Sequence, residues 1–142
     1  MKLPDANVLI YSVNTNAPQH GIAMDWLRNA FAAPAGVGLA WISLTAFVRI
    51  STRGGIFAQP LTIRQALKSM NFWLDQPRAR VLHPTARHAD VIGDLLAIAG
   101  SAGNLTNDAH LAALAIEHGA TLASFDGDFD RFDGLRFERL RT

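Results

Sequence analysis

Three aspartates lie where their carboxylates could bind one metal ion together. Asp5 and Asp126 lie at or just beyond the carboxyl ends of two short predicted strands, and Asp108 lies in the first turn of a predicted helix. Carboxylates that are brought together repel one another, and a cation relieves this repulsion. Oxygen ligands without cysteine suit Mg²⁺ or Mn²⁺, which also accept phosphate oxygens. The three aspartates therefore point to metal-dependent phosphodiester chemistry.

Each aspartate also has an ordinary structural interpretation. Asp5 is a good N-cap residue for a short following helix. Asp108 in a first turn complements the helix dipole, which is worth about 0.3–1 kcal/mol. Asp126 suits an Asx turn after a strand. These interpretations stay open for each residue taken alone, and the placement of all three at one edge of a sheet is what favours a site.

The apolar pattern predicts short strands that alternate with helices. The expected strands are residues 2–4, 37–43, 80–82, 121–124 and 136–140. The expected helices are residues 7–13, 20–33, 44–52, 62–75, 87–99 and 107–118, the last capped by Thr106. This alternation predicts an α/β fold with a mainly parallel sheet covered on both faces. Ligands in such sheets bind beyond the carboxyl ends of the strands, where the three aspartates could meet.

The composition narrows the class of protein. A chain of 142 residues with 49% hydrophobic and 18% charged residues is expected to be one globular domain, residues 1–142. Its net charge of +1 supplies no global basic field for nucleic acid, so such a partner would need a local patch. Cysteine is absent, which excludes disulfides and Cys-based metal sites. No apolar stretch approaches the ~20 residues that span a bilayer, so we expect a cytoplasmic protein without a membrane partner.

Other chemical signatures are missing from the sequence. The five histidines are scattered without metal-ligand spacing, and we expect them at the surface or packed at helix ends. No phosphate-binding P-loop or dinucleotide-binding glycine motif occurs.

The sequence resembles a known family at several motifs in order. Residues 3–11, Leu-Pro-Asp-Ala-Asn-Val-Leu-Ile-Tyr, resemble the opening of PIN-domain proteins, in particular the VapC ribonuclease toxins of type II toxin–antitoxin modules. Residues 106–115 and 124–129 are similar to the two remaining acidic motifs of that family. The resemblance implies a three-layer α/β/α sandwich, usually a homodimer. It also implies hydrolysis of RNA, often tRNA or ribosomal RNA, and a VapB-like antitoxin that inserts a segment into the active-site groove.

The resemblance assigns roles residue by residue. Asp5, Asp108 and Asp126 match the catalytic aspartates that hold the divalent ion, Mg²⁺ with Mn²⁺ as an alternative. Asp128 is either a fourth acid or a turn residue, and two polar residues could hydrogen-bond the site. These two are Asn7 and Ser124.

One position departs from the family pattern. The family usually carries a glutamate in the helix after the second strand, where this chain has Ala46 or a neighbour. Thr45 or Asp128 could partly compensate. The alternative function is a catalytically weak or inactive PIN-like module that binds RNA or a protein partner.

Two sets of exposed-looking residues have open roles. Arg49 and Arg53, one helical turn apart, either hold phosphates or lie on a solvated helix face. Three aromatic residues either anchor an antitoxin or pack in the core, and core packing is the expected role: Trp41, Phe47 and Trp73.

Overall fold

A parallel sheet forms the centre of the computed structural model, which describes residues 1–100 and 103–142. Within these residues the strands are β1 (Lys2–Pro4), β2 (Val37–Leu39), β3 (Ala79–Val81), β4 (Thr121–Ser124) and β5 (Phe137–Arg139). Their order in the sheet is β3-β2-β1-β4-β5, and every neighbouring pair is parallel. The chain moves outward from β1 to β3 and then returns to place β4 beside β1. The topological switch point therefore lies between β1 and β4.

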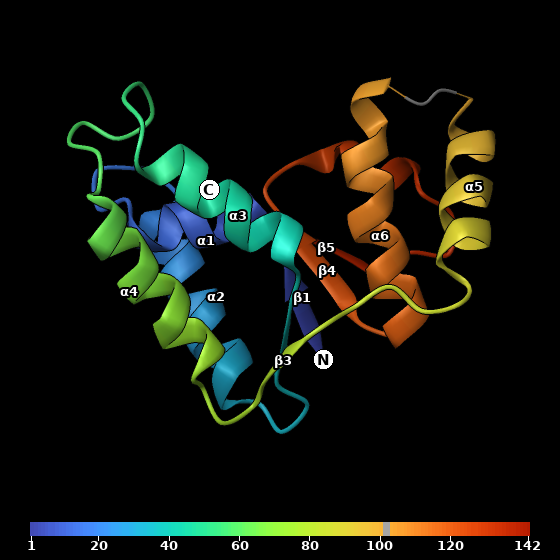
Figure 1. The fold of residues 1–142 in the computed structure, drawn as a ribbon, viewed down its shortest axis with the longest axis horizontal. Coiled ribbons are helices and arrows are strands. Elements are labelled where there is room, and N and C mark those ends of the chain that lie inside the picture. The colour runs from blue at the N-terminus through green and yellow to red at the C-terminus, as the bar shows by residue number, and fades with distance from the viewer. Residues whose placement is uncertain (101–102) are drawn as a thin grey trace.

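Helices cover both faces of this sheet (Figure 1). The helices α1 (Ala6–Val13), α2 (His20–Ala32), α3 (Trp41–Ser51) and α4 (Ile63–Leu74) lie on one side. The helices α5 (His88–Ala99) and α6 (Thr106–His118) lie on the other, and two short 3₁₀ helices are η1 (Gly103–Leu105) and η2 (Gly127–Arg131). The expected three-layer α/β/α architecture is confirmed.

Each layer of helices buries its own apolar core against the sheet. Leu3 and Leu122, both 0% exposed, pack with α5, α6 and η2. Val37 and Leu39 pack instead with residues of α1 to α4. The central strands β2 and β4 are almost entirely buried, whereas the outer strands β3 and β5 carry the exposed Arg80 and Arg139.

The boundary between β2 and α3 differs from the prediction. The expected strand 37–43 ends at Leu39, and α3 begins at Trp41 rather than at residue 44. The side chains that α3 buries follow helical spacing: Ser43, Leu44, Phe47 and Ser51. A short apolar run is compatible with a buried strand or a helix, and here packing against α1 and α4 selects the helix.

Helix ends show one confirmed and one wrong expectation. Thr62 begins α4 with a capping box, in which its hydroxyl accepts from Gln65 N and Gln65 returns a hydrogen bond. Thr106 does not cap α6, because the helix already includes it and Leu105 occupies the N-cap position. Among the described residues no helix has the length and apolar composition needed to cross a bilayer.

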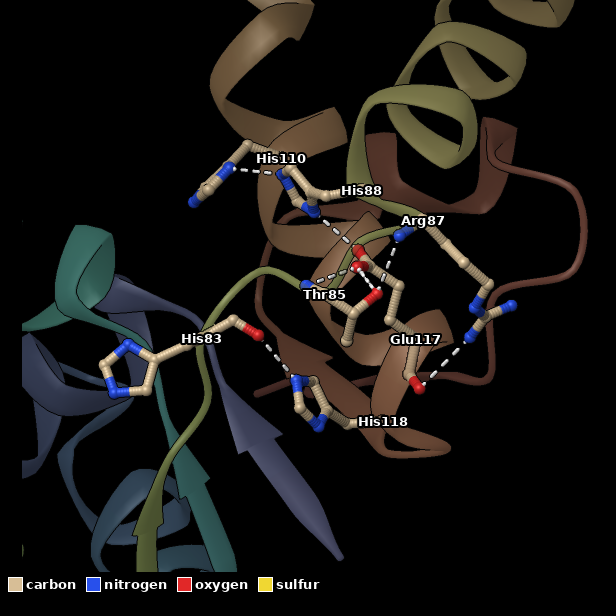
Figure 2. A network of polar contacts seen from close by, with 7 residues as sticks. All are labelled: His83, Thr85, Arg87, His88, His110, Glu117 and His118. Atoms are coloured by element: carbon tan, nitrogen blue, oxygen red, sulfur yellow. Dashed lines mark hydrogen bonds and ion pairs between the residues drawn. The ribbon is translucent and has the colours of Figure 1, made fainter.

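A buried glutamate ties the connection between β3 and α5 to α6 (Figure 2). The side chain of Glu117 is 0% exposed, and its Oε1 accepts from Thr85 N at 2.9 Å and Thr85 Oγ1 at 2.6 Å. Its Oε2 is hydrogen-bonded to His88, whose other ring nitrogen lies 2.9 Å from Nδ1 of His110. Burial opposes ionisation of Glu117, but the hydrogen bonds from Thr85 and His88 outweigh it and hold the pKa of Glu117 below its usual value. Two of the five histidines therefore belong to an internal network rather than to isolated surface positions.

We predict that Glu117→Gln lowers the free energy of unfolding by about 1–3 kcal/mol at pH 7. The reason is that a neutral amide replaces the buried carboxylate that is hydrogen-bonded to Thr85 and His88. The folded pKa of Glu117 lies below the ordinary 4.5, so its contribution is present above that pH and is lost as the pH falls through the folded pKa. Urea unfolding should therefore show the difference from wild type shrinking on acidification. The control is Asp94→Asn, a substitution at an exposed position. Equal stability of Glu117→Gln and wild type at pH 7 would contradict a stabilising role for the Glu117 hydrogen bonds.

Candidate active site

Two of the predicted aspartates lie side by side at the switch point. Asp5 directly follows β1, and Asp126 lies two residues beyond Ser124, the last residue of β4. The register pairs Pro4 with Ala123, and Asp5 N donates to Ala123 O at 2.9 Å. Adjacent parallel strands lie ~4.8 Å apart, so their carboxyl ends present these residues at one crevice.

Ser124 is the hydrogen-bond centre of this edge. Its hydroxyl is 0% exposed and donates to Asp5 Oδ2 at 2.7 Å. The same oxygen accepts from Asp126 N at 3.0 Å and from Asn7 Nδ2 at 3.0 Å. Asn7 Oδ1 in turn accepts from Phe125 N at 3.2 Å. One buried hydroxyl therefore positions the segments after β1 and β4 relative to each other.

The electrostatics join Asp108 to the same site. Burial, followed by the charges of Asp5, Asp126 and Asp128, raises the pKa of Asp108 to about 6 against the opposing effect of Arg131. Burial also raises the pKa of Asp5; hydrogen bonds from Ser124 and Ala6 oppose this, and the charge of Asp126 adds to it. Carboxylates that raise one another's pKa share an environment that a cation would stabilise.

The ordinary structural roles are also present. Asp5 is the N-cap of α1, with Oδ1 accepting from Ala6 N at 2.7 Å. Asp126 Oδ1 accepts from Asp128 N at 2.9 Å, as in an Asx turn, and Asp108 lies in the first turn of α6. These roles leave lone pairs on the carboxylate oxygens, so capping and cation binding are compatible.

The donor atoms at this edge are of the type that a hard divalent cation prefers, but the carboxylates alone do not complete its coordination. All the converging donors are oxygens, the ligand type of Mg²⁺ and Mn²⁺. Within residues 1–100 and 103–142, no group of three or more His, Cys, Asp or Glu side chains is arranged so that it could hold a metal ion. Such a cation would therefore rely on waters or substrate oxygens in addition to these carboxylates, as Mg²⁺ commonly does.

The neighbours proposed to replace the family glutamate are already engaged. Ala46 lies half-buried in α3, and the Thr45 hydroxyl donates to Trp41 O at 2.8 Å within its own helix. Asp128 pairs with Arg131 at 3.4 Å and still raises the pKa of Asp108. Asp128 is also a turn residue, since its N–H donates to Asp126 Oδ1, so both interpretations of this residue stay open.

The sequence and structure comparisons place this chain among known proteins. The PIN domain profile matches residues 2–135, nearly the whole chain. The chain belongs to the PIN-domain family. Among relatives, Ribonuclease VapC37 of Mycobacterium tuberculosis is 46% identical over 139 residues, covering 98% of this chain and 96% of the relative. Ribonuclease VapC33 of the same species is 38% identical over 137 residues, covering 96% of each. The resemblance seen in the sequence motifs is confirmed.

Solved structures share the fold of this PIN domain. Mycobacterium tuberculosis VapC20, described as a sarcin-ricin loop cleaving toxin, has a TM-score of 0.68 at 20% identity, covering 96% of this chain and 99% of that one. VapBC2 from Rickettsia felis, bound to a promoter DNA fragment, has a TM-score of 0.67 at 19% identity, covering 99% and 98%. At these identities the likeness concerns the fold alone.

The remaining expected residues separate into buried and exposed ones. Phe47 and Trp73 are 0% and 5% exposed, as core packing predicts, whereas Trp41 is 45% exposed and its expected core role is wrong. Trp41 is the first residue of α3, where the chain leaves the sheet. Arg53 lies beyond the end of α3, so it does not share a helix face with Arg49.

We predict that Ser124→Ala raises the pKa of Asp5 further, because the hydroxyl now donates to its ionised form. Carboxyl ¹³C NMR titration of the protein without added metal measures this directly. Ser12→Ala is the matched control, since Ser12 is also buried but donates to Leu9 O within α1. An unchanged Asp5 titration in Ser124→Ala would remove Ser124 from the site.

Proposed function

We propose that this PIN-domain protein is a metal-dependent endoribonuclease, the toxin component of a VapBC-type toxin–antitoxin module. The observation that carries the proposal is the meeting of Asp5 and Asp126 at the β1–β4 switch point, electrostatically coupled to Asp108. Relatives named VapC ribonucleases along nearly the full chain support the reaction class. We expect the substrate to be an RNA phosphodiester bond, in tRNA or ribosomal RNA.

The residues of this chain would divide the work as follows. Asp5, Asp108 and Asp126 would bind Mg²⁺, or Mn²⁺ in its place, together with waters or substrate oxygens that complete its coordination. When bound, such an ion lowers the pKa of water and neutralises phosphate charge. Ser124 fixes the Oδ2 atom of Asp5, and Asn7 anchors the backbone at Phe125. Below about pH 6 a proton competes for Asp108, since its pKa is raised to about 6.

The missing glutamate motivates the alternative function, a PIN-like module that binds RNA or a protein with little or no cleavage. Three ionised carboxylates around one dication leave a local charge of about −1, against about −2 for four. We infer that one ion is favoured over two until an RNA phosphate joins the site. Incubation of structured RNAs with and without Mg²⁺ or Mn²⁺ separates the functions, because RNA retained without cleavage at any metal concentration favours the module.

We predict that Asp5→Asn and Asp108→Asn abolish metal-dependent RNA cleavage while the fold is retained. Asn keeps the N-cap of α1, and Asp108→Asn removes a repelling charge, so the metal-free Asp108 variant should be more stable than wild type at pH 7. Mn²⁺ should raise the melting temperature of wild type and leave that of Asp108→Asn nearly unchanged.

The control for both readouts is Asp133→Asn, an exposed aspartate outside the site. Cleavage that persists in Asp5→Asn would exclude Asp5 from the mechanism. An equal Mn²⁺-induced shift in Asp108→Asn would show that the cation binds elsewhere.

An apolar groove between α2 and α4 gives the antitoxin a place to dock. The groove has a volume of about 730 Å³ and includes Met24, Phe31, Phe72 and Trp73. Phe72 is 64% exposed, which is unusual for so large an apolar side chain. We propose that an amphipathic helix of a VapB-like antitoxin lays its apolar face here, and that acidic residues of that helix meet the cations at the rim, Arg28 and Lys68.

We predict that Phe72→Asp prevents co-purification of a co-expressed antitoxin encoded beside this gene, while RNA cleavage persists. The charge would have to be buried unpaired in the complex, which is strongly unfavourable. Ile63→Asp is the matched control, because Ile63 is 68% exposed on the same helix but does not line the groove. Unchanged antitoxin capture by Phe72→Asp would place the antitoxin elsewhere.

A further inference from the structure

A second cavity lies at the carboxyl end of β5, next to the aspartate site. It has a volume of about 300 Å³ and is lined by Gln19, Phe125, Arg139, Leu140, Arg141 and Thr142. The register pairs Ser124 with Arg139, and Leu140 N donates to Ser124 O at 2.9 Å. Arg139 therefore leaves the sheet at the same edge as the hydroxyl that organises Asp5 and Asp126.

The guanidinium of Arg139 lies across the backbone between two of the acids. A β-carbon at position 127 would lie 2.6 Å from both Cζ and Nη1 of Arg139, so only the glycine between Asp126 and Asp128 allows this approach. Arg131, by comparison, pairs with Asp128 at 3.4 Å. Among the described residues Arg139 is in no ion pair within 4.0 Å, so its charge is available to a ligand.

A phosphate ligand explains these features together. The aspartate site repels a polyanion, so an RNA strand that enters it needs cations beside the site. Arg139 and Arg141 line one cavity and offer planar donor groups that match phosphate oxygens in pairs. Phe125 lines the same cavity and connects it to the aspartate edge through its hydrogen bond to Asn7.

We propose that this Arg139–Arg141 pocket binds a backbone phosphate of the RNA strand next to the bond that is cleaved. The inference rests on the proposed ribonuclease function and adds a substrate subsite to it. Arg139 and Arg141 act as binding residues, with the glycine at position 127 setting the place of the Arg139 guanidinium.

The test uses the Asp5→Asn protein, which leaves RNA uncut, and a labelled single-stranded RNA oligonucleotide followed by fluorescence anisotropy over a range of KCl. Each phosphate contact that is lost should reduce the slope of log K against log salt by about 0.7. We expect Arg139→Ala and Arg141→Ala each to show this loss and to weaken binding about tenfold at low salt. Arg139→Lys should restore part of the affinity and most of the slope.

The matched control is Arg136→Ala. Arg136 is exposed and directly precedes β5. Its substitution by alanine therefore removes the same charge as the test variants, but at the opposite edge of the sheet. Its affinity and salt slope should stay close to those of the Asp5→Asn parent.

Gly127→Ala tests the geometry without removing a charge. Position 127 does not have a positive φ, so alanine is compatible with its backbone, but the methyl group would displace the Arg139 guanidinium. We expect Gly127→Ala to weaken RNA binding when Arg139 is present and to have no further effect in the Arg139→Ala background. This non-additivity identifies an effect that acts through Arg139.

The outcomes separate the subsite from the ribonuclease proposal. Unchanged affinity and slope in both arginine variants would overturn the subsite, even if the wild type cleaves RNA. Weakened antitoxin capture with unchanged RNA binding would also overturn it and assign the pocket to a protein partner. A wild type that binds RNA through these arginines but never cleaves would instead contradict the ribonuclease proposal and leave the subsite supported.

Discussion

The cost of placing neighbouring carboxylates in a partly buried crevice at the ends of β1 and β4 is the constraint on which this site depends. Burial is the main cause of the raised pKa values of Asp5 and Asp108, and the charges of neighbouring aspartates raise them further, so the fold gains nothing in stability from bringing these carboxylates together. Ser124, buried beneath them, holds the two strand ends in place with one hydroxyl. This unfavourable contribution to stability is explained if the function requires several negative charges at one place.

The sheet topology brings the residues that follow β1 and β4 together. Since β4 returns to lie beside β1, two residues more than a hundred positions apart in the chain become neighbours at a switch point. Helix α6 then brings Asp108 toward the same crevice, while Glu117, near its other end, fastens the helix to the connection before α5. The candidate catalytic residue Asp108 and the stabilising residue Glu117 thus lie near opposite ends of α6.

Much of this could be predicted from local patterns, and the failures have physical reasons. The strands β1 and β4, the helix periodicities and the aspartates at strand ends are local signals, so they were accessible in the sequence. The β2–α3 boundary was not, because an apolar run suits both structures until packing is known. The family resemblance, rather than any local pattern, suggested that Ser124 hydrogen-bonds the site, and its bond to Asp5 agrees with that expectation. The role of Glu117 was hidden, since its hydrogen-bond network joins residues distant in sequence. Arg139 carries no motif, and only the pairing of β5 with β4 brings it to the site.

The two outer strands of the sheet have a consequence for how other molecules can associate with it. Both β3 and β5 are three residues long, so each offers only a short row of unpaired backbone groups at the rim of the sheet. Short outer strands are a common protection against intermolecular strand pairing and aggregation. Three-residue outer strands thus disfavour extension of the sheet by a foreign strand, and leave side chains and helix surfaces as the larger areas available for contact.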